Sequence, residues 1–152
     1  MKKLEYKIDF GSLILRVSIG IMFIIHGWGK LFGGPEVWEK LGSNMQYLGI
    51  SFWPQFWGFM GGFGEAFGGL LLAIGLFFRP ATFLLLCTMI VATARHIVLE
   101  DSFPWLSHSM EAGFLFLSLW FVGSGKYSLD FLLFRKERQR DVSRPNGSEN
   151  IG

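Results

Sequence analysis

Four long apolar stretches, separated by short polar connections, dominate the chain. They cover residues 12–31, 56–78, 81–99 and 105–122. A helix that crosses the hydrocarbon core of a bilayer needs about 20 mostly apolar residues, at a rise of about 1.5 Å each. The fourth stretch is the shortest. The pattern predicts an all-α integral membrane protein whose four spans pack as a helical bundle.

The connection between the first two spans, residues 33–55, is long enough for an element of its own. Pro35 suits the start of a helix, and apolar residues follow at helical spacing. They are Val37, Trp38, Leu41, Met45 and Leu48. Trp53 and Trp57, where this connection meets the second span, suit the membrane–water interface, where tryptophan is enriched. We therefore expect a short helix lying on the outer surface.

The distribution of Lys and Arg predicts the orientation. Basic residues flank the N-terminus, the tight turn at residues 78–80 and the C-terminal segment, whereas the other two connections are mainly acidic. Both termini are therefore expected in the cytoplasm, on either side of a multi-pass membrane domain. That domain covers residues 1–134. Residues 135–152 are polar and are expected to form a disordered basic cytoplasmic tail.

Composition excludes several classes of protein. The chain is 51% hydrophobic and only 17% charged, against about 25% charged residues in soluble domains. A net charge of +2, with its basic residues at the chain ends, gives no basis for nucleic-acid binding. The single cysteine, Cys87, excludes an intrachain disulfide and a Cys-x-x-Cys redox centre.

Ionisable side chains inside the spans are costly and point to function. From the predicted topology, seven of eight such residues fall in the outer half of the membrane, contributed by all four spans. Only Arg16 lies near the inner face, where its side chain is expected to reach the headgroups. The seven are His26, Lys30, Glu65, Arg95, His96, His108 and Glu111. We expect them to line a polar cavity open to the outside, with Glu65 at its floor.

Several explanations of this cluster stay open. Lys30 and Arg95 balance Glu65 and Glu111 in charge, so buried ion pairs that fix helix register would also suit it. A metal site is disfavoured, because di-iron bundles use Glu-x-x-His and this chain has the reverse order once only. A haem-ligating histidine pair has equally little support. An anion, a quinone head group or a small polar substrate fits the cations and histidines better.

Glycines predict close packing between the spans. The second span is rich in them, and Gly58/Gly62 and Gly64/Gly68 form small-xxx-small pairs. Such pairs let membrane helices approach closely.

The chain resembles the DoxX family of small bacterial membrane proteins in three motifs. They are residues 26–31 (HGWGKL), 64–72 (GEAFGGLLL) and 123–130 (GSGKYSLD). The resemblance covers about residues 13–133. It implies a four-helix inner-membrane protein, with relatives that include a subunit of a thiosulfate:quinone oxidoreductase. Another relative is linked to a complex with superoxide dismutase and a sulfurtransferase.

Three functions follow as hypotheses. The first is a redox or sulfur-stress subunit that binds a quinone or small anion and works with soluble redox or sulfurtransferase partners. No side chain here carries electrons, so such a subunit needs a cofactor or a partner, and whether the chain is itself an enzyme stays open. The second is a scaffold that docks partners through its tail. The third is a small-solute transporter, with a homo-oligomer as one arrangement.

Overall fold

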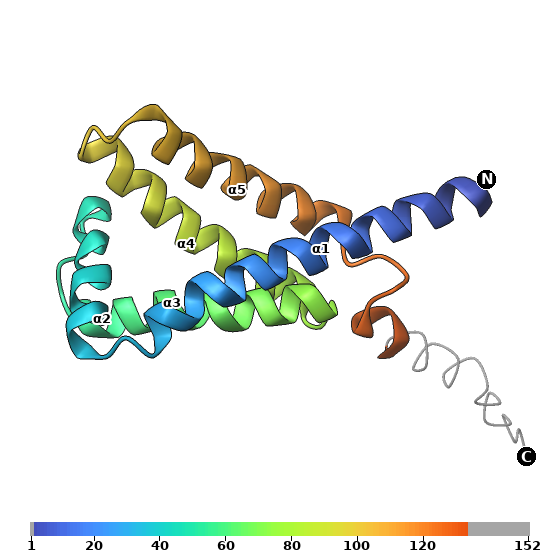
Figure 1. Cartoon of the computed structure of the whole chain (residues 1–152), viewed down its shortest axis with the longest axis horizontal. Coiled ribbons are helices and arrows are strands. Elements are labelled where there is room, and N and C mark those ends of the chain that lie inside the picture. The colour runs from blue at the N-terminus through green and yellow to red at the C-terminus, as the bar shows by residue number, and fades with distance from the viewer. Residues whose placement is uncertain (1, 134–152) are drawn as a thin grey trace, which may run out of the picture.

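The computed structural model describes residues 2–133, and within them every regular element is helical (Figure 1). The elements are α1 (Lys2–Leu31), α2 (Pro35–Gly42), the 3-10 helix η1 (Ser43–Leu48), α3 (Pro54–Ile74), α4 (Phe78–Val98) and α5 (Phe103–Val122). The all-α prediction and the short helix between the first two spans are confirmed. The predicted tail, residues 135–152, lies outside the described residues.

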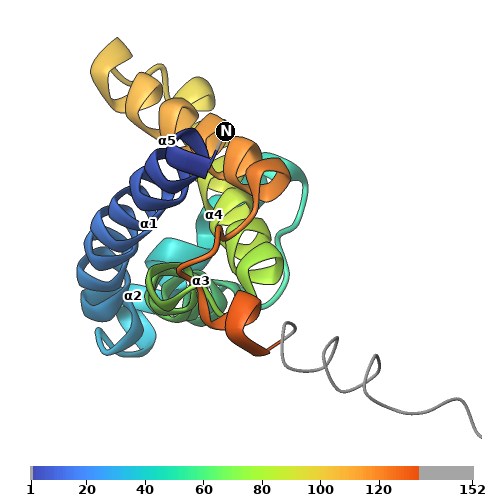
Figure 2. The ribbon, with the colours of Figure 1, turned by 90° about the vertical axis from the view of Figure 1, so that its right-hand side faces the viewer.

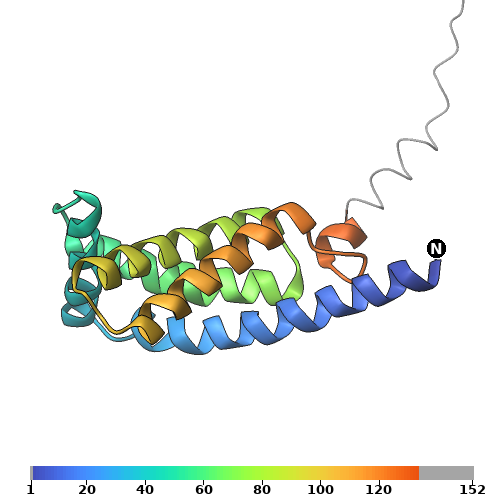
Figure 3. The same ribbon diagram turned by 90° about the horizontal axis from the view of Figure 1, so that it is seen from above.

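The four long helices run roughly along one axis, and α2 and η1 lie across one end of them (Figures 1 and 3). Three described helices are long and apolar enough to cross a membrane, over Tyr6–Leu31, Pro54–Ile74 and Phe78–Val98. The remaining long helix, α5, has 20 residues but is not one of these three, so its place as the fourth span stays a prediction. The end covered by α2 and η1 is the predicted outer end.

Glycines set how closely α1 and α3 approach. A methyl group added at Gly69 would sit 2.7 Å from the Gly20 carbonyl oxygen, and one at Gly62 would sit 2.8 Å from the Leu31 nitrogen. Gly68 faces α4 instead, where an added methyl would meet Leu85 at 3.1 Å. The glycine face of α3 therefore packs against one helix on each side, as the predicted close packing required.

The hydrophobic core lies between α3, α4 and α5, in the half of the bundle that includes the turn between α3 and α4. It contains Leu72 of α3, Phe78 and Leu85 of α4, and Phe116 and Leu119 of α5. Phe23 of α1 reaches Phe116 edge to face, with ring centroids 4.9 Å apart.

Arg16 is buried, so the expectation that it reaches the headgroups is wrong. Its Nη1 donates to the Ser124 carbonyl oxygen at 2.8 Å, and its Nη2 donates to the Tyr127 carbonyl oxygen. In the view along the bundle, the segment after α5 folds back beneath the turn between α3 and α4 (Figure 2). The Asp130 carboxylate accepts from the Phe77 and Phe78 amides at 2.9 Å each, which caps the start of α4. These contacts close the inner end.

At the outer end, α2 is held against both α1 and α3. The Trp38 indole N–H donates to the Lys30 and Leu31 carbonyl oxygens, at 3.0 and 3.2 Å, which satisfies acceptors left free at the end of α1. Gly42 and Gly58 let the backbones of α2 and α3 touch, because a side chain at either would overlap a carbonyl of the other helix. The helix therefore forms a fixed roof over the outer end.

Candidate binding cavity

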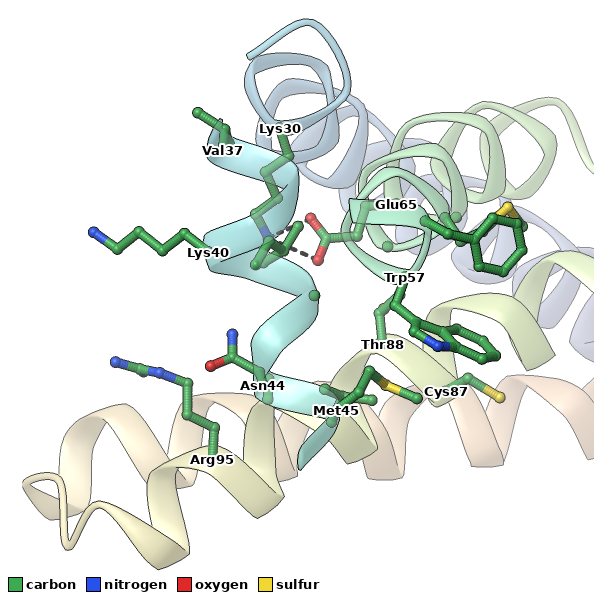
Figure 4. A pocket seen from close by; sticks show the side chains of 18 of the residues that line it. Lys30, Val37, Lys40, Asn44, Met45, Trp57, Glu65, Cys87, Thr88 and Arg95 are labelled. Carbon is green, nitrogen blue, oxygen red and sulfur yellow. Dashed lines mark hydrogen bonds and ion pairs between the residues drawn. The ribbon is translucent and has the colours of Figure 1, made fainter. Parts of the chain in front are cut away.

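A cavity of about 700 Å³ lies beneath this roof, between α2 and η1 on one side and α3 and α4 on the other (Figure 4). Its size suits a small-molecule ligand. The end of α1 contributes Lys30 to its wall, and α3 contributes Glu65. The cavity wall therefore comes from the helices α1 to α4 and from η1, which lie far apart along the sequence.

Lys30 and Glu65 form an ion pair on the cavity wall. The Lys30 Nζ lies 2.7 Å from Oε1 and 2.6 Å from Oε2 of Glu65, so it donates to both carboxylate oxygens. The Glu65 side chain is 7% exposed and that of Lys30 is 35% exposed. A carboxylate as buried as this one needs such a partner, because an unpaired charge away from water is costly.

Further polar side chains surround the pair. Lys40 and Asn44 of the roof and Arg95 of α4 gather on the same side of the cavity (Figure 4). The Arg95 guanidinium lies 3.4 Å from the Asp101 carboxylate, in the connection after α4. Three cations therefore line the cavity, one of them paired with a carboxylate inside it. This favours a ligand with a negative charge or a carbonyl oxygen.

The rest of the wall is apolar and aromatic. It includes Phe56, Met60, Leu84 and Val91, and the Trp57 ring lies beside Cys87 (Figure 4). The Trp57 Nε1–H is buried and has no hydrogen-bond partner among the described residues. A buried donor without an acceptor is costly, and a ligand oxygen would satisfy it once the side chains that cover this nitrogen shift.

The structure places the seven predicted site residues in two groups. Lys30, Glu65, Arg95 and His96 lie on the cavity wall. The other three, His26, His108 and Glu111, have exposed side chains and do not line it. The His26 Nδ1 lies 2.7 Å from the Met22 carbonyl oxygen of its own helix.

Several cavity residues were missed from the sequence. Lys40 and Asn44 were missed because the roof helix was interpreted only as interfacial. Trp57 was assigned to the membrane interface, and Cys87 was considered only for disulfides. Asp101 was missed because it lies in a connection between spans, although its position five residues after His96, at the end of a helix, indicated that it could turn back toward that histidine.

The part of the chain that the structure describes contains no group of three or more His, Cys, Asp or Glu side chains placed to hold a metal ion.

Comparison with known proteins agrees with the motifs. The DoxX family model matches residues 11–98. "Inner membrane protein YqjF" of Escherichia coli (strain K12) is 32% identical over 141 residues, which cover 90% of this chain and 99% of that protein. "Putative oxidoreductase CatD" of Bacillus subtilis (strain 168) is 30% identical over 138 residues, covering 89% and 96%. No solved structure matches. The resemblance in the motifs is thereby confirmed, and the chain belongs to the DoxX family of membrane proteins.

Proposed function

We propose that this chain is an integral subunit of a redox or sulfur-stress system in a bacterial inner membrane, and that its outer cavity binds a quinone or a small sulfur-containing anion. The cavity carries the proposal, because it joins an apolar, aromatic wall to cationic side chains and an indole N–H in need of an acceptor. The relatives support the setting, since one is named as an inner membrane protein and the other as an oxidoreductase, with that activity marked as unproven.

The residues present fit a quinone. Its flat ring suits the aromatic wall, and one carbonyl oxygen would accept the orphaned Trp57 N–H. Lys30 and Arg95 would stabilise negative charge on an oxygen at the other end of the cavity. A bound quinone supplies the electron-carrying chemistry that the side chains lack. A sulfur-containing anion would use the cations alone.

In this proposal the cavity opens on the side of the membrane away from the cytoplasm, and both termini lie in the cytoplasm. Soluble redox or sulfurtransferase partners would supply the electrons on the side where the cavity opens, because the side chains of this protein cannot carry them across the membrane. The basic residues 135–152 are the docking segment of the scaffold alternative.

Binding of two probes to the purified, detergent-solubilised chain tests the proposal. Equilibrium dialysis would measure the affinity for decylubiquinone, a short-chain quinone, and separately for thiosulfate. Trp57→Phe keeps the aromatic ring and removes its N–H, so it should weaken decylubiquinone binding about threefold to tenfold, which is the value of one hydrogen bond. Thiosulfate binding should not change. Trp105→Phe is the matched control, because Trp105 is exposed and lies outside the cavity.

Each outcome separates the hypotheses. Binding of neither probe would remove the ligand-binding function, and loss of partner association on deletion of residues 135–152 would then favour a scaffold. Equal effects of the two Trp→Phe changes would show that the cavity N–H does not meet the quinone.

A further inference from the structure

The outer end of α4 carries a histidine–carboxylate pair at the rim of the cavity. The His96 Nδ1 lies 2.7 Å from Oδ2 of Asp101. The His96 side chain is 14% exposed and lines the cavity, whereas Asp101 approaches it from the connection between α4 and α5. The His96 ring therefore lies on the cavity wall, and one of its two nitrogens is bound by Asp101.

The chain reverses sharply to make this contact. Glu100 adopts a left-handed backbone with φ of 51°, which residues other than glycine rarely do. The reversal brings the Asp101 amide nitrogen within 3.1 Å of the His96 carbonyl oxygen. Asp101 therefore binds His96 through both its backbone and its side chain. Uncommon backbone conformations of this kind persist where the surrounding structure fixes them, and they concentrate at functional sites.

The partner decides which ring nitrogen carries the proton. A carboxylate accepts hydrogen bonds and cannot donate them, so Nδ1 of the neutral ring must hold the hydrogen. Nε2 is then left as an acceptor. Carboxylate partners fix the tautomer and orientation of histidines in this way in metal and catalytic sites.

We propose that Asp101 is a positioning residue that holds His96 in the Nδ1–H tautomer, so that Nε2 accepts a proton or an O–H hydrogen bond from a ligand in the cavity. The nature of that ligand rests on the proposed function. For a quinone site, Nε2 would accept from the hydroxyl of the reduced form, the quinol. The oxidised form offers only carbonyl acceptors there. The pair would therefore favour the quinol, whereas the cations and Trp57 serve either form.

Among the described residues one other charged group reaches Nδ1. The Arg95 Nη1 lies 3.4 Å from both the His96 Nδ1 and the Asp101 Oδ2, and a guanidinium can only donate. The Asp101 carboxylate, at 2.7 Å, is the closer partner of Nδ1, and Arg95 can donate to that carboxylate instead. Glu65 of α3 forms its ion pair with Lys30 of α1. Where α5 packs beside this end of α4, the contact between them is the neutral hydrogen bond from Thr93 to Ser109. Asp101 is accordingly the carboxylate that sets the tautomer.

Nitrogen-15 NMR of the histidine-labelled, ligand-free protein tests the tautomer directly. Spectra would be taken at about pH 8.5, above the ordinary range for imidazole ionisation. The chain has three histidines, and loss of one signal in His96→Gln assigns His96. We expect a protonated Nδ1 and an unprotonated Nε2. Asp101→Ala should move the hydrogen to Nε2, and Glu111→Ala, which removes an exposed carboxylate that does not line the cavity, should leave the tautomer unchanged.

A second measurement separates positioning from mere stabilisation of the loop. The affinities of decylubiquinol and decylubiquinone would be compared under anaerobic conditions. In Asp101→Ala the quinol should lose about fivefold to tenfold relative to the quinone, as expected for one hydrogen bond. An equal loss of both affinities would overturn the proposal, because a structural role predicts exactly that pattern. An Nε2–H tautomer in the wild type would overturn it too. If neither probe binds, the proposed function fails and the NMR result alone decides the role of Asp101.

Discussion

The ion pair between Lys30 and Glu65 makes an asymmetric prediction. Lys30→Met strands a carboxylate whose side chain is 7% exposed, whereas Glu65→Gln strands an ammonium group whose side chain is 35% exposed and can turn to water. Removing one partner of a buried pair costs about 3–5 kcal/mol. We expect a loss near the lower end, about 3 kcal/mol, for Lys30→Met. For Glu65→Gln we expect about 1 kcal/mol, in the range of exposed pairs.

The double variant separates the pair from its individual residues. In Lys30→Met/Glu65→Met both charges are gone, and replacing a buried pair by apolar side chains is often close to neutral. The double variant should therefore be more stable than Lys30→Met alone. Residues in contact are expected to deviate from additivity in this way.

Thermal unfolding of the detergent-solubilised protein, followed by tryptophan fluorescence, would measure these changes. A chain of this length loses about 2–4 °C in Tm per kcal/mol, so Lys30→Met should lower Tm by about 6–12 °C and Glu65→Gln by about 2–4 °C. Lys40→Met is the matched control, because Lys40 lines the same cavity with an exposed side chain. The reasoning is refuted if Glu65→Gln is the more harmful single change, or if the double variant loses the sum of both.

Three further changes probe the parts that hold the cavity in place. Arg16→Met removes two buried charge-assisted hydrogen bonds, so it should destabilise the protein by at least about 3 kcal/mol in the same unfolding assay. The control, Arg79→Met at an exposed position, should have little effect. Gly58→Ala should cost about 1–3 kcal/mol and weaken decylubiquinone binding, because the added methyl would overlap the backbone of α2; Gly29→Ala, where nothing lies within 4 Å, is its control and should not destabilise. Asp130→Ala should lower stability by about 1 kcal/mol through loss of the cap on α4, and an unchanged Tm would contradict that role.

The helices could be predicted from the sequence because their signals are local. Apolar length alone located the long helices, and Pro35 with the apolar spacing after it located α2. The end of α3 was predicted four residues too late, at residue 78. The helix stops at Ile74 because Gly75 takes a left-handed conformation, with φ of 68°. The end of α3 thus depends on the turn that follows it. Asp130, far along the chain, binds this turn by accepting a hydrogen bond from the Phe77 N–H.

The cavity could be predicted only in part, because sequence position gives depth along a helix but not the reach of a side chain. His26 and Lys30 lie four residues apart and share a face of α1. The long Lys30 side chain still crosses to Glu65, whereas the short imidazole of His26 stays beside the Met22 carbonyl.

On α5 the orientation of the helix decides which side chains face the bundle. The buried residues Ser109, Phe116 and Leu119 define the face that meets the bundle. His108 and Glu111 fall beside that face, so their side chains stay exposed. Their similar depth to the cavity residues was therefore not enough to bring them together.

Charge inside a span is not by itself a mark of function, and this chain holds both cases. Arg16 is fully buried, and its Nη1 and Nη2 donate to backbone carbonyls within residues 123–130, one of the three motifs that carry the family resemblance. Glu65 is nearly as buried, yet its partner is a flexible side chain on a cavity wall. A carbonyl partner cannot leave without unfolding the segment that bears it, whereas a lysine can turn toward a ligand. In the proposed function, a buried charge can serve a ligand only if its partner can move away, so we expect Lys30 and Glu65, rather than Arg16, to take part in binding.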